Sequence, residues 1–187
     1  MSAIISDCGK YRYRLERGNP LKPAVAFIMV NPSTADAETD DPTIRKVRGF
    51  AERAGYDHFI VGNLFAYRAT DITALRATAD PTGPDNDDHL DLIMRDAALH
   101  IVAWGALAKL PDKLRKRWVD VVRLADRAGC QLHCIGNNDD KHPRHPLMTS
   151  YDTPITEWAV PWFANRAPSL VSEESSVAPL SQESSKP

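Results

Sequence analysis

The sequence predicts an α/β protein, a three-layer α/β/α sandwich with a mainly parallel four-stranded central sheet and an additional N-terminal edge strand. Two observations lead to this prediction. Near-continuous apolar runs, which are typical of strands covered on both faces, recur along the chain. Amphipathic helical segments separate them, and strands joined by helices form parallel sheets with helices packed on their faces.

The first half of the chain contains two central strands and one helix. Three segments are predicted strands, the first at the edge and the other two in the centre: 11–15, 24–30 and 58–65. Between the central pair, the apolar stripe of a helix runs over 42–55. Asp41 is its expected N-cap, Pro42 suits the first turn, and Gly55 ends it.

The second half repeats the pattern. Helices are predicted over 86–99 and 112–128, and central strands over 100–104 and 131–135. A last short helix is expected over 153–163. Residues 1–166 therefore form a single α/β domain, and 167–187, rich in Ser, Glu and Pro, are expected to be a disordered tail.

Composition narrows the classes of function. The formal net charge is −2, and the tail accounts for it with three acids and one base. A domain without net charge argues against strong non-specific binding to duplex DNA. No long apolar run or leader is present, so we expect a cytoplasmic protein without a membrane span, and a monomer. The three cysteines lack the spacing of a disulfide or metal framework, and no metal or cofactor is expected.

Polar and aromatic residues follow every predicted central strand. In parallel α/β sheets, ligands bind beyond the carboxyl ends of the strands. The segments in question are 31–36, Asn63 with Phe65, Tyr67 and Arg68, the pair Trp104–Gly105, and 136–147. The sequence thus predicts a site at one edge of the sheet.

These strand ends resemble the uracil-DNA glycosylase superfamily. VNPSTAD (30–36) is similar to the polar loop that holds the hydrolytic water, and GNLFAYRAT (62–70) places an asparagine where that family reads the base edge. AWGALAKL (103–110) resembles its WG pattern, and HPL (145–147) its HPS-type loop, whose histidine faces the leaving base. The four segments occur in the same order, within residues 23–150. The resemblance implies a fold of the glycosylase type.

A closer resemblance is to a bacterial and phage family, domain of unknown function 1643. The segments NPSTAD, DDPTIR and NLFAYRATD, and a WG followed by HPL, are the pattern of that family. This closer resemblance implies no particular reaction, so a reaction follows only by analogy with the glycosylases.

Cleavage of an N-glycosidic bond defines the roles that we assign. It yields a cation-like sugar and an anionic base, so the site needs an acceptor for water and a donor for the base. Asn31 is the candidate that holds the water. Asp36, or Asp40, is the candidate base or the group that stabilises the sugar cation. His145, as a neutral imidazole, is the candidate donor to the departing base.

The remaining predicted site residues contact the substrate, which we expect to be a nucleotide or a single-stranded or flipped base of a nucleic acid. Asn63 suits the Watson–Crick edge, Phe65 or Tyr67 would stack, and Leu147 or Met148 would act as a wedge. The complete substrate-binding set is Pro32, Ser33, Asn63, Phe65, Tyr67, Arg68, Trp104, Gly105 and Leu147.

Structural roles compete with these assignments. Asn31 before Pro32 is also typical of a strand-to-turn boundary. Phe65 and Tyr67 also suit simple packing, Arg68 an ion pair, and the basic residues 113–117 a solvated helix face. Two other functions stay open: a non-catalytic module that binds a nucleotide or modified base, and a hydrolase or transferase that uses these acids and the histidine on a phosphate or acyl group.

Overall fold

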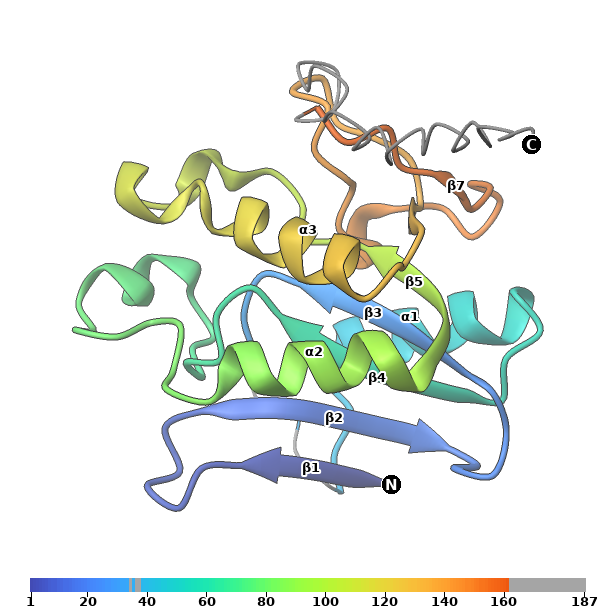
Figure 1. Ribbon diagram of the computed structural model, residues 1–187, viewed down its shortest axis with the longest axis horizontal. Helices are drawn as coiled ribbons and strands as arrows, with labels where there is room; N and C mark the ends of the chain where they lie inside the picture. The colour runs from blue at the N-terminus through green and yellow to red at the C-terminus, as the bar shows by residue number, and fades with distance from the viewer. Residues whose placement is uncertain (34, 36–37, 162–187) are drawn as a thin grey trace, which may run out of the picture.

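A seven-stranded mixed sheet forms the centre of the computed structural model, which describes residues 1–33, 35 and 38–161 (Figure 1). The strands lie in the order β1-β2-β4-β3-β5-β6-β7. Their bounds are β1 Ser2–Ile5, β2 Arg12–Gly18, β3 Ala24–Met29, β4 His58–Asn63, β5 Ala97–Val102, β6 Leu132–Cys134 and β7 Thr156–Glu157.

The four central strands are parallel to one another, as predicted. β3 pairs with both β4 and β5, and β5 pairs with β6. The sheet is larger than the predicted one, because β1, β2 and β7 join it in antiparallel orientation. The predicted edge strand, 11–15, lies inside the sheet as part of β2. The edge is β1, whose Ala3 pairs with Leu15.

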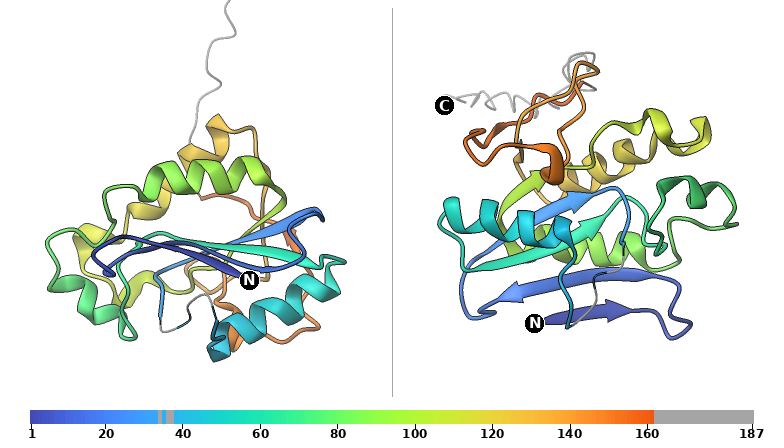
Figure 2. Two further views of the ribbon diagram at one scale, coloured as in Figure 1. Left: turned by 90° about the horizontal axis from the view of Figure 1, so that it is seen from below. Right: turned by 180° about the vertical axis from the view of Figure 1, so that it is seen from behind.

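Helices cover both faces of the sheet (Figure 2). α1 (Pro42–Arg53) packs on one face, and α2 (Asn86–Asp96) and α3 (Arg117–Arg127) pack on the other. The period-two alternation of β3 explains the division. Val25 and Phe27 belong to the core on the α1 face, whereas Ala26 and Ile28 belong to the core under α2 and α3.

The helix ends agree in part with the predicted signals. The Asp41 carboxylate accepts the backbone N–H of Ile44 at 2.8 Å and caps α1, and Pro42 is its first residue, both as predicted. α2 ends at Asp96 instead of Leu99, because Ala97 begins β5 and pairs with Ala24. α3 begins at Arg117 and is preceded by a separate 3₁₀ turn, Asp112–Leu114.

The prediction of a helix over 153–163 is wrong for its described part. β7 occupies Thr156–Glu157 and pairs with Cys134 and His133 of β6, and the N–H of Trp158 donates to the carbonyl of Leu132. Pairing with an open sheet edge satisfies these backbone groups without a helix. The predicted tail, 167–187, lies outside the described residues. No helix in the described part is long and apolar enough to cross a membrane.

An ion pair attaches the segment before α1 to the sheet. Arg17 of β2 has a fully buried side chain, and its Nε donates to Asp40 at 2.7 Å. Arg48 of α1 donates to the other carboxylate oxygen at 2.7 Å. Burial alone would raise the pKa of the Asp40 carboxyl, but the hydrogen bonds from Arg48 and Arg17 outweigh it and hold that pKa below its ordinary value.

We therefore expect Asp40→Asn to lower the free energy of unfolding by about 3 kcal/mol, since it removes a carboxylate that pairs with the buried Arg17 guanidinium. The depressed pKa means that this stabilisation is present above the pKa of the unfolded state and is lost as pH falls through the lower folded value. Urea unfolding at several pH values measures both effects. The control Asp112→Asn, whose carboxylate is 89% exposed, should cost less than about 0.5 kcal/mol; equal losses would contradict the prediction.

Candidate functional site

A cleft of about 830 Å³ opens beyond the carboxyl end of β3, on the α1 face of the sheet. The first turn of α1, residues 69–73 and the loop that carries His145 form its walls. Four of the predicted site residues line it: Asn31, Ser33, His145 and Leu147. The cleft therefore lies at the edge of the sheet where the sequence places a candidate site, and it unites residues of the first and last of the four polar segments.

The Asn31 side chain has a fixed orientation. Its Nδ2 donates to the carbonyls of Ala69, at 2.7 Å, and Pro32, at 3.1 Å. Both amide hydrogens are used in this way, so the amide cannot be turned over without loss of these bonds. Oδ1 accepts no hydrogen bond from the described residues, and Asn31 thus presents an acceptor at the wall of the cleft.

His145 has a defined tautomer when neutral. It precedes the 3₁₀ turn Pro146–Met148, and its Nδ1 accepts the backbone N–H of Leu147 at 3.3 Å. The hydrogen of the neutral ring is therefore on Nε2, which makes no hydrogen bond with the described residues. Burial lowers the pKa of His145, and the nearby Asp41 carboxylate opposes this shift. At neutral pH the ring is an uncharged donor.

Gly105 packs behind His145. It has φ +76°, a left-handed conformation that favours glycine, and a Cβ there would lie 3.1 Å from the Cβ of His145. The close approach needs a residue without a side chain. Gly105 thus supports the histidine loop and does not line the cleft.

Asn63 is the last residue of β4 and lies in the sheet beside the cleft. It is 1% exposed, and neither Oδ1 nor Nδ2 has a hydrogen-bond partner among the described residues. Asn63 is in register with Met29, which lines the cleft, and alternation places its side chain on the same face as Val61, the α1 face. A buried amide without partners is costly, typically by about 1–3 kcal/mol.

The other predicted contacts lie away from the cleft. Phe65 lines a second pocket on the opposite face. Tyr67 packs edge-on against Tyr11, and Arg68 Nη1 donates to the Gly9 carbonyl at 3.3 Å. The Trp104 indole donates to His142 at 3.3 Å and is 2% exposed.

The structure describes one of two further predicted site residues in the first loop, Pro32, and does not describe the other, Asp36. Pro32 is buried, and its carbonyl accepts from Asn31 and from the backbone of Ala69. It shapes the loop. Asp36, the predicted base, lies outside the described residues. Asp40, the other candidate, is held by the two arginines described above.

The cleft also contains residues without a predicted role, among them the charged Arg12, Asp71 and Lys109. Arg12 is 2% exposed, and its Nη1 donates to the carbonyl of Ala35. Asp71 accepts from the N–H of Thr73, and this bond is the main cause of its lowered pKa. Lys109 lies within the AWGALAKL segment (103–110), of which only Trp104 and Gly105 were predicted to belong to the site. An arginine buried in β2 has no comparable sequence signal.

The cysteines make ordinary contacts. Cys130 donates to the carbonyl of Met94, Cys134 lies against Asn137, and burial raises the pKa of both thiols. In the part of the chain that the structure describes, no three His, Cys, Asp or Glu side chains are grouped to hold a metal ion.

Two aspartates should control the pKa values of the two loop histidines separately. Asp41→Asn keeps a capping side chain and should lower the pKa of His145 further, because the opposing carboxylate is removed. Asp140→Asn should instead lower the pKa of His142, whose value is reduced by burial and raised by Asp140. NMR titration of the ring protons measures both, and the nitrogen shifts report the Nε2–H tautomer. A His145 pKa above 6.5, or shifts of both rings in either variant, would contradict this assignment.

Comparison with known proteins gives one match. The model of a family described as "Protein of unknown function (DUF1643)" matches residues 12–147. These residues include every cleft residue discussed above. Neither the curated proteins nor the solved structures give a significant match to the chain.

Proposed function

The chain belongs to the DUF1643 family, and we propose that its cleft binds a nucleotide unit, free or within a nucleic acid, and hydrolyses its N-glycosidic bond. With this function we propose the finer relationship, that the domain is a distant relative of the uracil-DNA glycosylases. The support is the arrangement of the strand ends in the order of that superfamily, with Asn31 and His145 in one cleft.

The observation that carries the proposal is a matched acceptor and donor. Asn31 offers Oδ1 with its amide fixed, and His145 offers a neutral Nε2–H. N-glycosidic hydrolysis needs this pair, because water must be oriented at the sugar while negative charge develops on the base. A cleft of about 830 Å³ has room for a base and its sugar.

The reaction follows from these positions. Water, held by Asn31 Oδ1, attacks the anomeric carbon as the bond to the base nitrogen breaks. The bonding electrons leave with the base, and the Nε2–H of His145 donates a hydrogen bond to the resulting anion. The water adds its oxygen and one hydrogen to the sugar as a hydroxyl group. Its other proton is taken up by the anionic base, which then leaves as the neutral molecule.

Asn63 supports recognition of a base. Its buried side chain offers two donors and an acceptor, and none of them has a partner among the described residues. It lies one strand away from Met29 in the cleft wall. A ligand that moves this wall by a small amount would satisfy the amide. The cost of the unpaired amide in the empty protein would then be offset in the complex.

One observation favours recognition without cleavage as the second candidate. The described carboxylates of the cleft already have structural roles. Asp41 caps α1, and Asp71 accepts the N–H of Thr73 and caps the 3₁₀ turn Ile72–Arg76. Lys109 offers the cleft a cation that can pair with an anionic group such as phosphate. In this candidate function, the cleft holds a nucleotide and releases it unchanged.

Base release from nucleosides, nucleoside monophosphates and single-stranded oligonucleotides with uracil, mismatched or hypermodified bases tests the proposal. We expect Asn31→Ala and His145→Ala each to reduce release at least about 100-fold, and His145→Gln, which keeps a donor, to retain part of it. The control Asn19→Ala, in the turn before β3, should act as wild type, and unfolding measurements verify each fold. Calorimetric binding of a nucleotide without any product would select recognition instead.

Substitution of Asn63 tells whether this residue serves the stability of the fold or the binding of a ligand. Leucine branches at the same atom as asparagine, so Asn63→Leu should leave the packing in place and remove the unpaired amide. We expect the free energy of unfolding to rise by about 1 kcal/mol, because the desolvated amide is lost, while affinity for the ligand falls. Urea unfolding and calorimetry measure the two quantities. A loss of stability without loss of affinity would mean that Asn63 serves the fold alone.

A further inference from the structure

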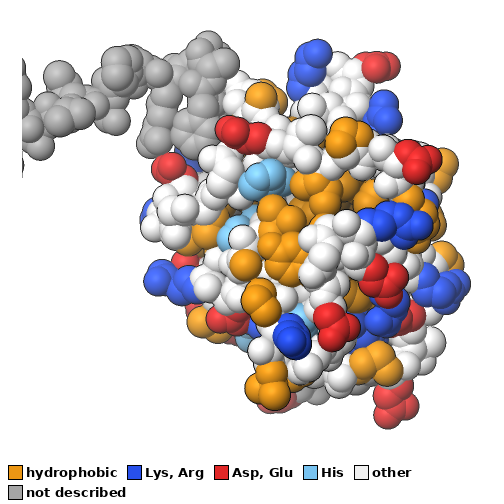
Figure 3. Space-filling view, turned by 90° about the vertical axis from the view of Figure 1, so that its right-hand side faces the viewer, with side chains coloured by type: hydrophobic (Ala, Val, Ile, Leu, Met, Phe, Trp, Pro, Cys, Tyr) orange, Lys and Arg blue, Asp and Glu red, His pale blue; other side chains and the backbone are white. Residues whose placement is uncertain are grey.

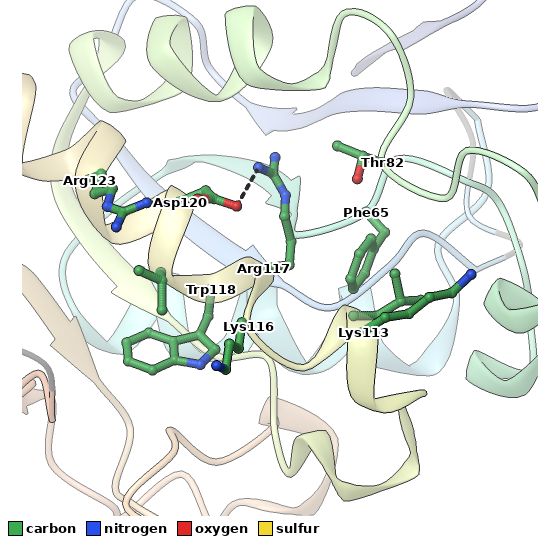
Figure 4. Close-up of a pocket in the computed structure, with 10 residues that line it drawn as sticks. Phe65, Thr82, Lys113, Lys116, Arg117, Trp118, Asp120 and Arg123 are labelled. Atoms are coloured by element: carbon green, nitrogen blue, oxygen red, sulfur yellow. Dashed lines mark hydrogen bonds and ion pairs between the residues drawn. The ribbon is translucent and has the colours of Figure 1, made fainter.

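A second pocket of about 630 Å³, here called the α3 pocket, opens at the same edge of the sheet on the opposite face (Figure 4). Phe65, just beyond β4, contributes to it from the sheet, and the start of α3 and the turn before it contribute most of the rest. Basic and aromatic side chains line it together, as Figure 4 shows for Lys113, Lys116 and Trp118.

Two lysines of the α3 pocket are available to contact a ligand. Lys113 and Lys116 are exposed, and their ammonium groups make no ion pair or hydrogen bond with the described residues. The acid of the pocket, Asp120, is in contrast already neutralised, by Arg117 at 3.6 Å and Arg123 at 3.3 Å. The net charge offered to a ligand is therefore positive.

The aromatic side of the pocket is fixed in position. Trp118 is half-buried, and its ring meets His142 and Trp158 edge-on, with centroid distances of 5.3 and 6.0 Å. Phe65 is 1% exposed and lies at the floor. A ring held on two sides loses little conformational entropy when a flat ligand stacks on it.

Lysines stand at both ends of the stretch that joins the cleft to the α3 pocket, and the acid between them, Asp112, is paired with Arg115 at 2.7 Å. The cleft and the α3 pocket are separated by the short 3₁₀ turns Leu107–Lys109 and Asp112–Leu114. Lys109 lines the cleft, and Lys113, four residues later, lines the α3 pocket. At the other side of the molecule, where the parallel strands begin, acidic and basic side chains are interspersed around apolar surface (Figure 3).

We propose that the α3 pocket binds the nucleotide that adjoins the one in the cleft, so that the ligand is a single strand of nucleic acid lying across residues 107–116. The inference rests on the proposed function for the occupant of the cleft. Lys113 and Lys116 contact phosphates, and Trp118 stacks on an unpaired base. Stacking on an indole requires a base with a free face, which selects a single strand over a duplex.

Fluorescence anisotropy with a labelled oligothymidylate of about 12 nucleotides, titrated between about 50 and 200 mM salt, tests the inference. For single strands each phosphate contact contributes about 0.7 to the slope of log K against log salt. The double variant Lys113→Gln/Lys116→Gln should therefore reduce the slope by about 1.4 and weaken binding about tenfold or more at low salt. Trp118→Leu should weaken it by at least about fivefold, and Trp118→Phe should retain most of the affinity.

A charge-matched control isolates the position of the lysines. Lys22→Gln/Arg127→Gln removes two exposed cations that line neither the cleft nor the α3 pocket, and should leave the slope within about 0.3 of wild type. If both double variants behave alike, if Trp118→Leu binds normally, or if wild type does not bind the strand, the inference is overturned. Thermal unfolding of each variant verifies that it is folded.

Failure of the inference and failure of the proposed function give different results. Strand binding that depends on Lys113 and Lys116, with no base released from any substrate, supports the α3 pocket and refutes hydrolysis. Base release from free nucleotides that is unaffected by Lys113→Gln/Lys116→Gln, with no strand binding, supports hydrolysis in the cleft and refutes strand binding in the α3 pocket.

Discussion

The parallel pairing of β3 with both β4 and β5 is the constraint on which the rest of the structure depends. All six residues of β3 are buried, so its polar groups must be satisfied by neighbouring strands, and two parallel partners satisfy them on both sides. Parallel partners end at the same edge. Asn31, Asn63 and the Trp104–Gly105 pair are brought there by backbone hydrogen bonds, before any of their side chains contributes.

The candidate site residues Asn31 and His145 depend on that edge in different ways. Asn31 is held by carbonyls of its own loop and of Ala69, and His145 is held by the N–H of Leu147 and the close approach of Gly105. In both residues the bonds that orient the side chain leave one polar atom without a partner among the described residues. A side chain that is fixed but not satisfied is a pre-organised one, which binds a ligand without further loss of its own freedom.

The sequence predicts the features of this fold that arise from local signals. Apolar runs locate the central strands, and Asp41 with Pro42 locates the start of α1, because caps and first turns have specific chemistry. It does not predict β7, since a two-residue strand exists only through its pairing with β6. For the site, it predicts that Asn31 and His145 share an edge, but not that Phe65 lies on the opposite face, because one residue of register decides the face.

A domain without net charge can still bind nucleic acid when cations gather at one place on its surface, as Lys113 and Lys116 do in the α3 pocket. A net charge near zero limits long-range attraction, yet affinity for a strand depends on the local balance along its path. In the α3 pocket Arg117 pairs with Asp87 and Asp120, and Arg123 pairs with Asp120, while the two lysines make no ion pair with the described residues. The fold thus separates structural cations from available ones. Ionic contacts between lysines and phosphates weaken rapidly as salt is raised. Stacking of a base on a fixed aromatic ring adds affinity that does not depend on charge, and Trp118 lies beside Lys116 in the α3 pocket where it can provide such a contact.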